Sequence, residues 1–287
     1  MELRGTGIWS FHMRYGDAGL IAESAAELDD LGYRAIWIPD VGGDVLDAVE
    51  LLLRATPHIG VATGILNVWL QDPVEVAQRR SQWGGDWQDR FTLGLGASHA
   101  PLINQGHPNR YTKPYTKMVD FLDKLDGAAV PFPVESRVLG ALGPRMLALA
   151  GERASGAHPY FVPPEHVVRA REILGAKATI AVELAVVLDS DPASARTVAR
   201  THTGIYLTLP NYTNNLRHFG FGDSDFVDGG SDRLIDAIVA WGDLDAIVQR
   251  VTAMRHAGAD HVCIQVIRAE GEMPRSEWRN LAAALLE

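Results

Sequence analysis

The sequence predicts a (β/α)8 barrel, also called a TIM barrel: an α/β fold in which eight parallel strands alternate with helices. Short runs of β-branched and apolar residues recur behind amphipathic stretches along the chain. Most of these runs are apolar on both faces, which is typical of a parallel sheet covered by helices. The 287 residues exceed the roughly 250 that such a barrel usually needs. We therefore expect one domain over residues 1–287, with a helical insertion late in the chain.

An open doubly wound sheet is the alternative arrangement for alternating strands and helices. That fold usually carries a Gly-x-Gly-x-x-Gly turn after its first strand. The first predicted strand opens the segment TGIWSFHMRYGD, residues 6–17, which contains no such turn. The closed barrel is therefore preferred.

The first half of the chain contains four strands, each followed by a helix. Aspartate or proline stands at or near the start of several helices, and β-branched and aromatic residues mark the strands. The predicted strands are residues 6–11, 33–40, 58–65 and 90–97. The predicted helices are residues 16–32, 44–56, 73–88 and 112–125, the last after a loop over residues 98–111.

The second half begins with LGALGPRMLALAGERASGAHPYF, residues 139–161, which predicts a strand, a Gly-Pro corner, a helix and another strand. A helix over residues 163–175 and a strand over residues 178–189 follow. Residues 191–257 are predicted to be mostly helical, with a glycine-rich break at residues 220–230. An eighth strand over residues 259–267 and a helix over residues 275–287 complete the pattern.

Composition narrows the classes of function. No run of 18 apolar residues is present, so we expect a soluble protein with no membrane partner. The first 15 residues carry charge and glycine where a secretory leader would be apolar, which favours a cytoplasmic location. The formal net charge of −10 argues against nucleic-acid binding, because no run of basic residues offsets it.

The sequence also carries no metal-site signature. Cys263 is the single cysteine, so neither an internal disulfide nor a cysteine-cluster metal site can form. Histidines and acidic residues show no two-ligand spacing on one element. We expect no bound metal.

In a barrel of this kind the active site lies at the carboxyl ends of the strands. These ends carry the candidate residues Ser10, Phe11 and His12; Asp40; residues 64–67; residues 97–99; residues 143–146; His158 and Tyr160; Glu183; and Arg268.

The Gly-Pro corner at residues 143–146 is the strongest anion-binding candidate. Gly143 permits close approach, Pro144 suits a first helical position, and the amides of a helix start favour an anion. Arg145 can add a charge-assisted contact. An ordinary turn between a strand and a helix is the alternative interpretation.

The other candidates are single titratable side chains. Asp44 is better placed than Asp40 to cap the following helix, which leaves Asp40 free to face the cavity. His99 and His158 are candidates for proton transfer, or are polar contacts or loop histidines. Glu183 interrupts an apolar strand, so its carboxylate must be paired or line a wet cavity, or it is structural.

Four segments together carry a resemblance to a known family: GYRAIWIPD (residues 32–40), IGVATGILNVWLQDPVEVA (59–77), RFTLGLGASHAPL (90–102) and residues 139–161. In order and spacing they resemble the bacterial-luciferase-like oxidoreductases, especially the branch that uses the deazaflavin coenzyme F420. The resemblance spans nearly the whole chain and is weak after residue 190.

The resemblance implies a deazaflavin at the carboxyl ends of the strands, with its phosphate at the Gly-Pro corner. It also implies a non-prolyl cis peptide at the positions of Gly64 and Ile65, after the third strand. His99 or His158 would transfer the accompanying proton. The implied cofactor-binding residues are Asp40, Gly64, Ile65, Asn67, Ala97, Ser98, Ala141, Leu142, Gly143, Pro144, Arg145 and Met146.

The activity implied is hydride transfer between coenzyme F420 and a small organic substrate, with Arg110, Lys113 and Arg145 near the acidic cofactor tail. Val41 and Gly42 stand where family members that oxidise alcohols often carry a histidine, which puts that reaction in doubt. The alternatives are an FMN-dependent monooxygenase that uses O2 and an inactive flavin-binding barrel. Relatives also imply a homodimer.

Overall fold

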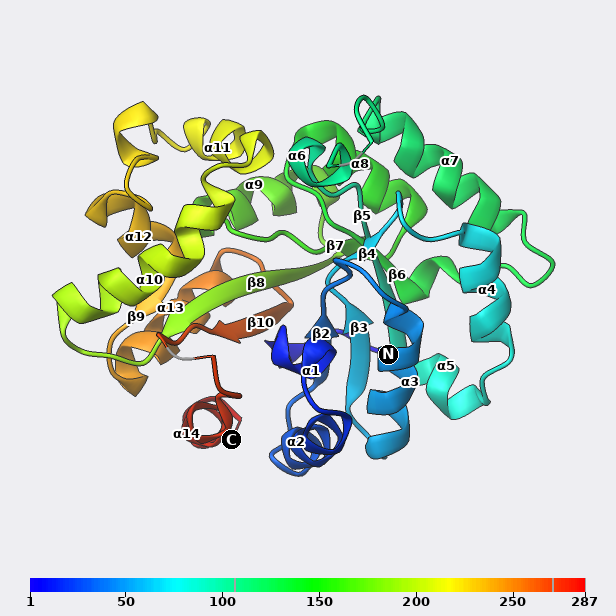
Figure 1. Ribbon diagram of the computed structural model, residues 1–287, viewed down its shortest axis with the longest axis horizontal. Helices are drawn as coiled ribbons and strands as arrows, with labels where there is room; N and C mark the ends of the chain where they lie inside the picture. The colour runs from blue at the N-terminus through cyan, green and yellow to red at the C-terminus, as the bar shows by residue number, and fades with distance from the viewer. Residues whose placement is uncertain (106, 270, 287) are drawn as a thin grey trace.

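The computed structural model describes residues 1–105, 107–269 and 271–286, and it contains a closed barrel of eight parallel strands surrounded by helices (Figure 1). Pairing of β8 with β10 closes the barrel, which excludes the open doubly wound sheet. The barrel strands are β1 (Gly5–Trp9), β2 (Ala35–Ile38), β3 (Gly60–Thr63), β5 (Phe91–Gly96), β6 (Arg137–Leu139), β7 (Gly156–Ala157), β8 (Thr179–Val187) and β10 (His261–Val266). Two short strands extend the sheet: β4 (Leu66–Asn67) pairs with β5, and β9 (Val239–Trp241) pairs with β8.

Alternation along each strand separates an outer core from a small inner one. Ile36 and Ile38 of β2 face the surrounding helices, whereas Ala35 and Trp37 face the barrel interior. The barrel interior has room for large side chains because small residues stand next to them on the neighbouring strands. A Cβ atom on Gly7 would lie 2.6 Å from His261 Nε2, for example.

The helices follow the strands and begin with local caps. Aspartate side chains accept backbone N–H groups at the starts of α2, α3, α4, α10 and α13, and proline opens several others. The helices are α1 (His12–Tyr15), α2 (Ala18–Asp30), α3 (Val45–Ala55), α4 (Pro73–Ser81), α5 (Gly85–Arg90), α6 (Ala100–Ile103), α7 (Pro114–Asp126), α8 (Pro144–Arg153), α9 (Pro164–Leu174), α10 (Pro192–Tyr206), α11 (Pro210–Arg217), α12 (Asp232–Ile238), α13 (Leu244–His256) and α14 (Arg275–Leu285).

Two local predictions were wrong. The predicted helix over residues 73–88 is split into α4 and α5, because the Gly84–Gly85 pair starts a new helix. The predicted loop over residues 98–111 contains α6. Residues 191–257 are mostly helical, as predicted, and they also contain β9, whose three residues are too few to show a strand period.

The late helical excursion is present and adds a second hydrophobic cluster. Helices α10, α11 and α12 lie together on one side of the barrel, away from α4 and α7 (Figure 1). Leu207, Leu216 and Leu234 of this region pack with Phe161, which follows β7. The excursion therefore reaches the carboxyl ends of the barrel strands.

Candidate active site

Two tryptophans fill the barrel interior just below its mouth, the end at which the strands have their carboxyl termini. Trp37 donates its indole N–H to His261 Nε2 at 3.1 Å, and its ring stacks on that of His158 at 4.4 Å. Trp9 lies beside Tyr160 at 5.4 Å and donates its indole N–H to Gly64 O at 3.0 Å. The mouth thus has a fixed aromatic base.

The chain bulges between β3 and β4, and the Gly64–Ile65 peptide there is cis, so this expectation is confirmed. A Cβ atom on Gly64 would lie 2.6 Å from Trp9 Nε1 and 3.1 Å from His158 Nε2, so only glycine fits. The Ile65 side chain lies against Gly96 and Gly140, across the ends of β5 and β6. It is half-buried and presents an apolar surface at the mouth.

Asp40 ties the end of β2 to β4. Its Oδ2 accepts the backbone N–H of Asn67 at 3.0 Å and the Gln71 side-chain amide at 3.1 Å. Its Oδ1 is buried without a hydrogen-bond partner, and burial raises the pKa of the carboxyl. Asp44 caps α3, as the sequence predicts. Asp40 therefore holds a free acceptor at the mouth.

The start of α8 is open to solvent. Gly143, Pro144 and Arg145 are exposed, and no side chain caps the helix. Leu142 just before it receives a hydrogen bond from His166 Nε2 at 3.1 Å, which anchors the corner to α9. This leaves backbone N–H groups of the helix start without side-chain partners.

Basic side chains gather beside this helix start. The Arg145 guanidinium lies over the Tyr115 ring at 4.2 Å, and Lys117 lies over Trp69 at 5.6 Å. Arg110 donates to Trp69 O at 2.6 Å. Together with exposed Lys113 they form what we call the basic cluster: Arg110, Lys113, Lys117 and Arg145. Within the described residues no ion pair involves any of the four, so the cluster concentrates positive charge on a protein of net charge −10.

His99 and Ser98 lie at the end of β5. Ser98 has a φ of 54°, and its carbonyl accepts the side chains of Tyr111 and Asn211, each at 3.3 Å. The His99 ring lies 4.9 Å from that of Tyr212, and its Nδ1 has no partner. Burial lowers the pKa of His99 to about 4, so its imidazole is neutral at pH 7.

His158 lies deeper than the sequence alone indicates. It is 2% exposed, and its Nδ1 donates to Ala181 O at 2.7 Å, because a carbonyl can only accept. Its Nε2 has no partner, and burial lowers its pKa to about 4. The two predicted histidines are therefore not equivalent: His99 stands at the rim and His158 below the bulge.

Glu183 faces the interior and forms no ion pair with any residue that the structure describes. Its Oε2 accepts the backbone N–H of Phe161 at 3.1 Å, and its Oε1 is buried without a partner. Burial raises its pKa to about 8, so the carboxyl is largely protonated at pH 7.

Sequence reasoning missed an aromatic surface that closes one side of the mouth. Tyr160 and Tyr206 are joined by their hydroxyls at 2.8 Å, and their rings lie near those of Tyr212 and His202. We call Tyr160, Tyr206, Tyr212, His99 and His202 the aromatic wall. Three of these residues come from α10 and α11, whose position over the barrel no local pattern could have given.

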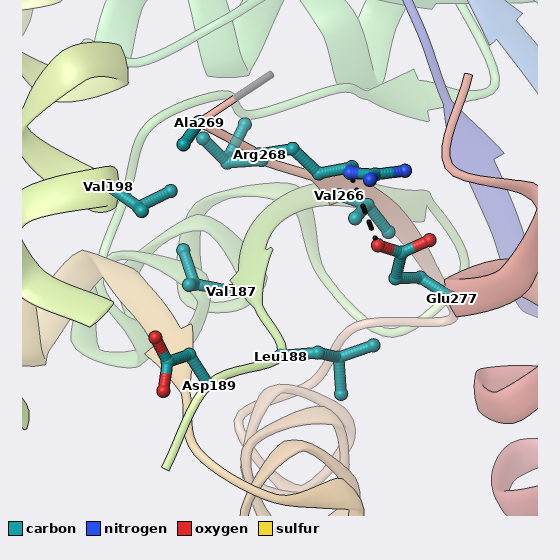
Figure 2. Close-up of a pocket in the computed structure, with 9 residues that line it drawn as sticks. Val187, Leu188, Asp189, Val198, Val266, Arg268, Ala269 and Glu277 are labelled. Atoms are coloured by element: carbon teal, nitrogen blue, oxygen red, sulfur yellow. Dashed lines mark ion pairs between the residues drawn. The ribbon is translucent and has the colours of Figure 1, made fainter. Parts of the chain in front are cut away.

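A pocket of about 260 Å³ opens beside the mouth, at the ends of β8 and β10 (Figure 2). Val198 of α10 and Asp189 line one side, and Arg268 and Glu277 line the other. Arg268 Nε lies 3.3 Å from a carboxylate oxygen of Glu277, so α14 neutralises this candidate residue.

In the described part of the chain, no group of three or more His, Cys, Asp or Glu side chains is arranged to hold a metal ion. No helix among those residues has the length and hydropathy needed to cross a membrane.

Comparison with known proteins identifies the family of this chain. The model of a family described as luciferase-like monooxygenase matches residues 6–261. A 4-hydroxyprotoasukamycin monooxygenase of Streptomyces nodosus subsp. asukaensis is 25% identical over 178 residues. That match covers 50% of this chain and 47% of the relative, so the chain spans about half the length of this curated relative.

Solved structures with the same fold come from enzymes that differ in cofactor, either F420 or FMN. Coenzyme F420-dependent tetrahydromethanopterin reductase from Methanopyrus kandleri has a TM-score of 0.76 at 17% identity, over 99% of both chains. An F420-dependent secondary alcohol dehydrogenase with an F420-acetone adduct has a TM-score of 0.75 at 14% identity, over 99% of both chains. The FMN-bound oxygenating constituent of 3,6-diketocamphane monooxygenase from Pseudomonas putida has a TM-score of 0.68 at 15% identity, over 97% of this chain and 96% of that one.

Proposed function

Since the chain belongs to the luciferase-like monooxygenase family, whose model matches residues 6–261, we propose that it is an oxidoreductase using coenzyme F420. The reaction is hydride transfer between the deazaflavin ring and a small organic substrate at the barrel mouth. The proposal includes a homodimer, as the resemblance implies.

The observation that carries the choice of cofactor is the basic cluster beside the start of α8. Coenzyme F420 has a phosphate followed by an acidic glutamate tail, whereas FMN ends at its phosphate. Arg145 and the exposed helix start suit the phosphate, and Lys113, Arg110 and Lys117 suit carboxylates beyond it. An anionic tail would give these cations the ion-pair partners that the described residues do not supply.

Asp40 and the bulge suit the ring. The buried, unpartnered Oδ1 of Asp40 can accept an N–H from the polar edge of a flavin or deazaflavin. Ile65 offers an apolar surface for the ring face. Asn67, Ala97 and Ser98 lie on the adjoining strand ends, and Ala141 and Leu142 lie before the helix start.

The bound deazaflavin would supply the hydride chemistry, and the chain would position the reactants and manage the proton. His99 is neutral at pH 7, and its free Nδ1 at the rim can accept or relay a proton. We assign the proton role to His99. His158 stays a predicted proton-transfer residue, but its stacking on Trp37 suits it to supporting the bulge.

An FMN-dependent monooxygenase is the second candidate. It is favoured by the match to a monooxygenase and by the fold shared with an FMN-bound enzyme. Both cofactors present a similar polar ring edge to Asp40, so that residue does not discriminate between them.

Oxygen consumption separates the two candidates. Protein mixed under air with reduced F420, and separately with reduced FMN, is followed in an oxygen electrode across a panel of enones and imines, which can accept a hydride. Alcohols, which donate a hydride, are tested with oxidised F420 instead. We expect substrate-dependent oxidation of reduced F420 without oxygen uptake. Substrate-dependent oxygen uptake with reduced FMN alone would replace the proposal with the monooxygenase.

A further inference from the structure

The aromatic wall lines one side of the barrel mouth, next to the position proposed for the cofactor. Tyr160 follows β7, His99 ends β5, and α10 and α11 bring His202, Tyr206 and Tyr212 over them. Ring centroids lie 5.2 Å apart for Tyr160 and Tyr206, 5.5 Å for Tyr206 and Tyr212, and 4.8 Å for His202 and Tyr206. The five rings form one connected group, and its first and last members, His99 and Tyr212, are more than 100 residues apart in the sequence.

The wall is physically joined to the bulge. Tyr160 packs against Trp9, and Trp9 holds Gly64 O through its indole N–H. A molecule that lies against Tyr160 would therefore lie near the position proposed for the cofactor ring.

None of the five side chains of the wall carries a charge at neutral pH. Burial lowers the pKa of His99 to about 4 and that of His202 to about 3. Burial raises the pKa of Tyr206 to about 12 and also raises the pKa values of Tyr160 and Tyr212. Cations on α10 point to other partners: Arg196 pairs with Asp236 at 2.6 Å, and Arg200 pairs with Asp232.

Polar atoms at the wall have unused hydrogen-bonding capacity. His202 Nε2 and His99 Nδ1 are buried without partners, and so is Oε1 of Glu183, which is held through Phe161. His202 and Glu183 are each more than nine-tenths buried. An unmet buried polar atom is unfavourable, so a ligand group that meets it gains affinity.

We propose that the aromatic wall binds the substrate of the reaction proposed above, and that it selects an uncharged, planar aromatic or conjugated ring bearing a hydrogen-bonding group. Ring faces of the wall stack on a planar ring. An anionic substrate would lose its hydration against an uncharged surface that offers no cation. The basic cluster, in contrast, suits anions. The two parts of the mouth would therefore hold different molecules: the basic cluster holds the cofactor tail, and the aromatic wall holds the substrate.

The rings of the wall touch one another in this structure, so a substrate ring must separate them to enter. Tyr212 joins the wall to the end of β5, because its ring lies 4.9 Å from that of His99. It lies on α11, an eight-residue helix whose neighbouring residue Asn211 contacts Ser98 through a hydrogen bond of 3.3 Å.

The test uses two probes of the same ring system that differ in charge. Binding of 2-naphthol and of 2-naphthoate to the full-length protein is measured by isothermal titration calorimetry at pH 7, in both the presence and the absence of F420. We expect 2-naphthol to bind at least about tenfold more tightly than 2-naphthoate. Equal affinities, tighter binding of the anion, or no binding of 2-naphthol would each overturn the inference.

Single substitutions test where 2-naphthol binds. Tyr212→Ala and His202→Phe should each weaken 2-naphthol binding, the first by about tenfold because it removes a ring face. Trp87→Ala is the matched control, because it truncates a half-buried aromatic side chain on α5, before β5 and so at the opposite end of the barrel. Asp40→Ala, on the cofactor side, should leave 2-naphthol affinity unchanged in the titrations without F420.

Loss of 2-naphthol affinity in Asp40→Ala, with none in Tyr212→Ala, would place the probe in the cofactor site and overturn the inference. The failure of the proposed function is separate and shows as absent F420 binding in the unsubstituted protein. Folding of each variant is checked by its thermal unfolding temperature.

Discussion

At the scale of single residues, burial decides the chemistry of the candidate site more than residue type does. Asp40 and Glu183 are both carboxylates with one unpartnered oxygen. Asp40 accepts two hydrogen bonds and lies near Arg14, and these partly offset the rise in its pKa. Glu183 accepts one hydrogen bond, and no cation in the described structure lowers its pKa. Asp40 is therefore suited to accept a hydrogen bond from a ligand at the rim, and Glu183 is suited to an uncharged interior.

Asp40→Ala should weaken F420 binding by about 10- to 100-fold, because a hydrogen bond to a charged acceptor contributes about 1.5–3 kcal/mol. Fluorescence titration of the cofactor measures the change. Asp72→Ala is the matched control, since Asp72 also accepts two backbone N–H groups but caps α4 on the surface. An unchanged affinity in Asp40→Ala would remove Asp40 from the cofactor site.

Glu183→Gln should change how the free energy of unfolding depends on pH. The folded-state pKa of about 8 lies above the ordinary value of 4.5, so the folded state holds the proton more strongly and loses stability as pH rises toward 8. The slope approaches about 1.4 kcal/mol per pH unit. Urea unfolding between pH 6.5 and 8 should show this decline in the parent protein and a flatter profile in the glutamine variant. Identical profiles would mean that Glu183 is ionised when folded.

At the scale of elements, the strand and helix ends on the carboxyl side of the barrel form a mouth with two chemically different sides. The start of α8 with α7 and the preceding loop carries cations, whereas α10 and α11 carry uncharged rings. The aromatic side joins His99, at the end of β5, to Tyr212 of α11, and the cationic side lies on α7, α8 and the preceding loop. The division between the two sides therefore exists only in the folded protein.

Arg145→Ala should weaken F420 binding and make it less sensitive to salt, because one charge–charge contact is lost and salt screens such contacts. Affinity is measured at several NaCl concentrations. Arg54→Ala is the matched control, since Arg54 is also exposed and lies over a ring, that of Trp87, on the far side of the barrel. The same affinity and salt slope as the parent protein would contradict the placement of the cofactor tail.

At the scale of the whole molecule, buried histidines limit stability in acid. His99, His158, His166 and His261 have pKa values lowered to about 4, and His202 to about 3, all by burial. The unfolded chain binds these protons near pH 6.5, so the folded state loses stability as pH falls from about 6.5 toward 4.

We expect the thermal unfolding temperature to be highest near pH 6.5–7 and to fall steeply below pH 6. Below pH 6.5 the histidines dominate, and above it the decline due to Glu183 remains. Differential scanning fluorimetry from pH 4 to pH 9 measures the profile. A flat profile between pH 4 and pH 6.5 would mean that these histidines are solvated in the folded protein.

The sequence was sufficient to predict the barrel, because the alternation of strand and helix repeats eight times and each unit is locally encoded. It also pointed to the strand ends, where Asp40, Gly64 and His99 lie. The aromatic wall could not be predicted, since contacts such as His99 with Tyr212 join residues more than 100 positions apart. The depth of His158 was equally hidden, because burial depends on Trp37 and Ala181 of other strands.

The measurement that tests the central claim most directly is a titration of the purified protein with F420 and, separately, with FMN, followed by quenching of cofactor fluorescence. We expect F420 to bind at least about tenfold more tightly than FMN, because the basic cluster contacts an acidic tail that FMN lacks. Tighter binding of FMN would contradict the claim in favour of a monooxygenase, and binding of neither would favour an inactive barrel.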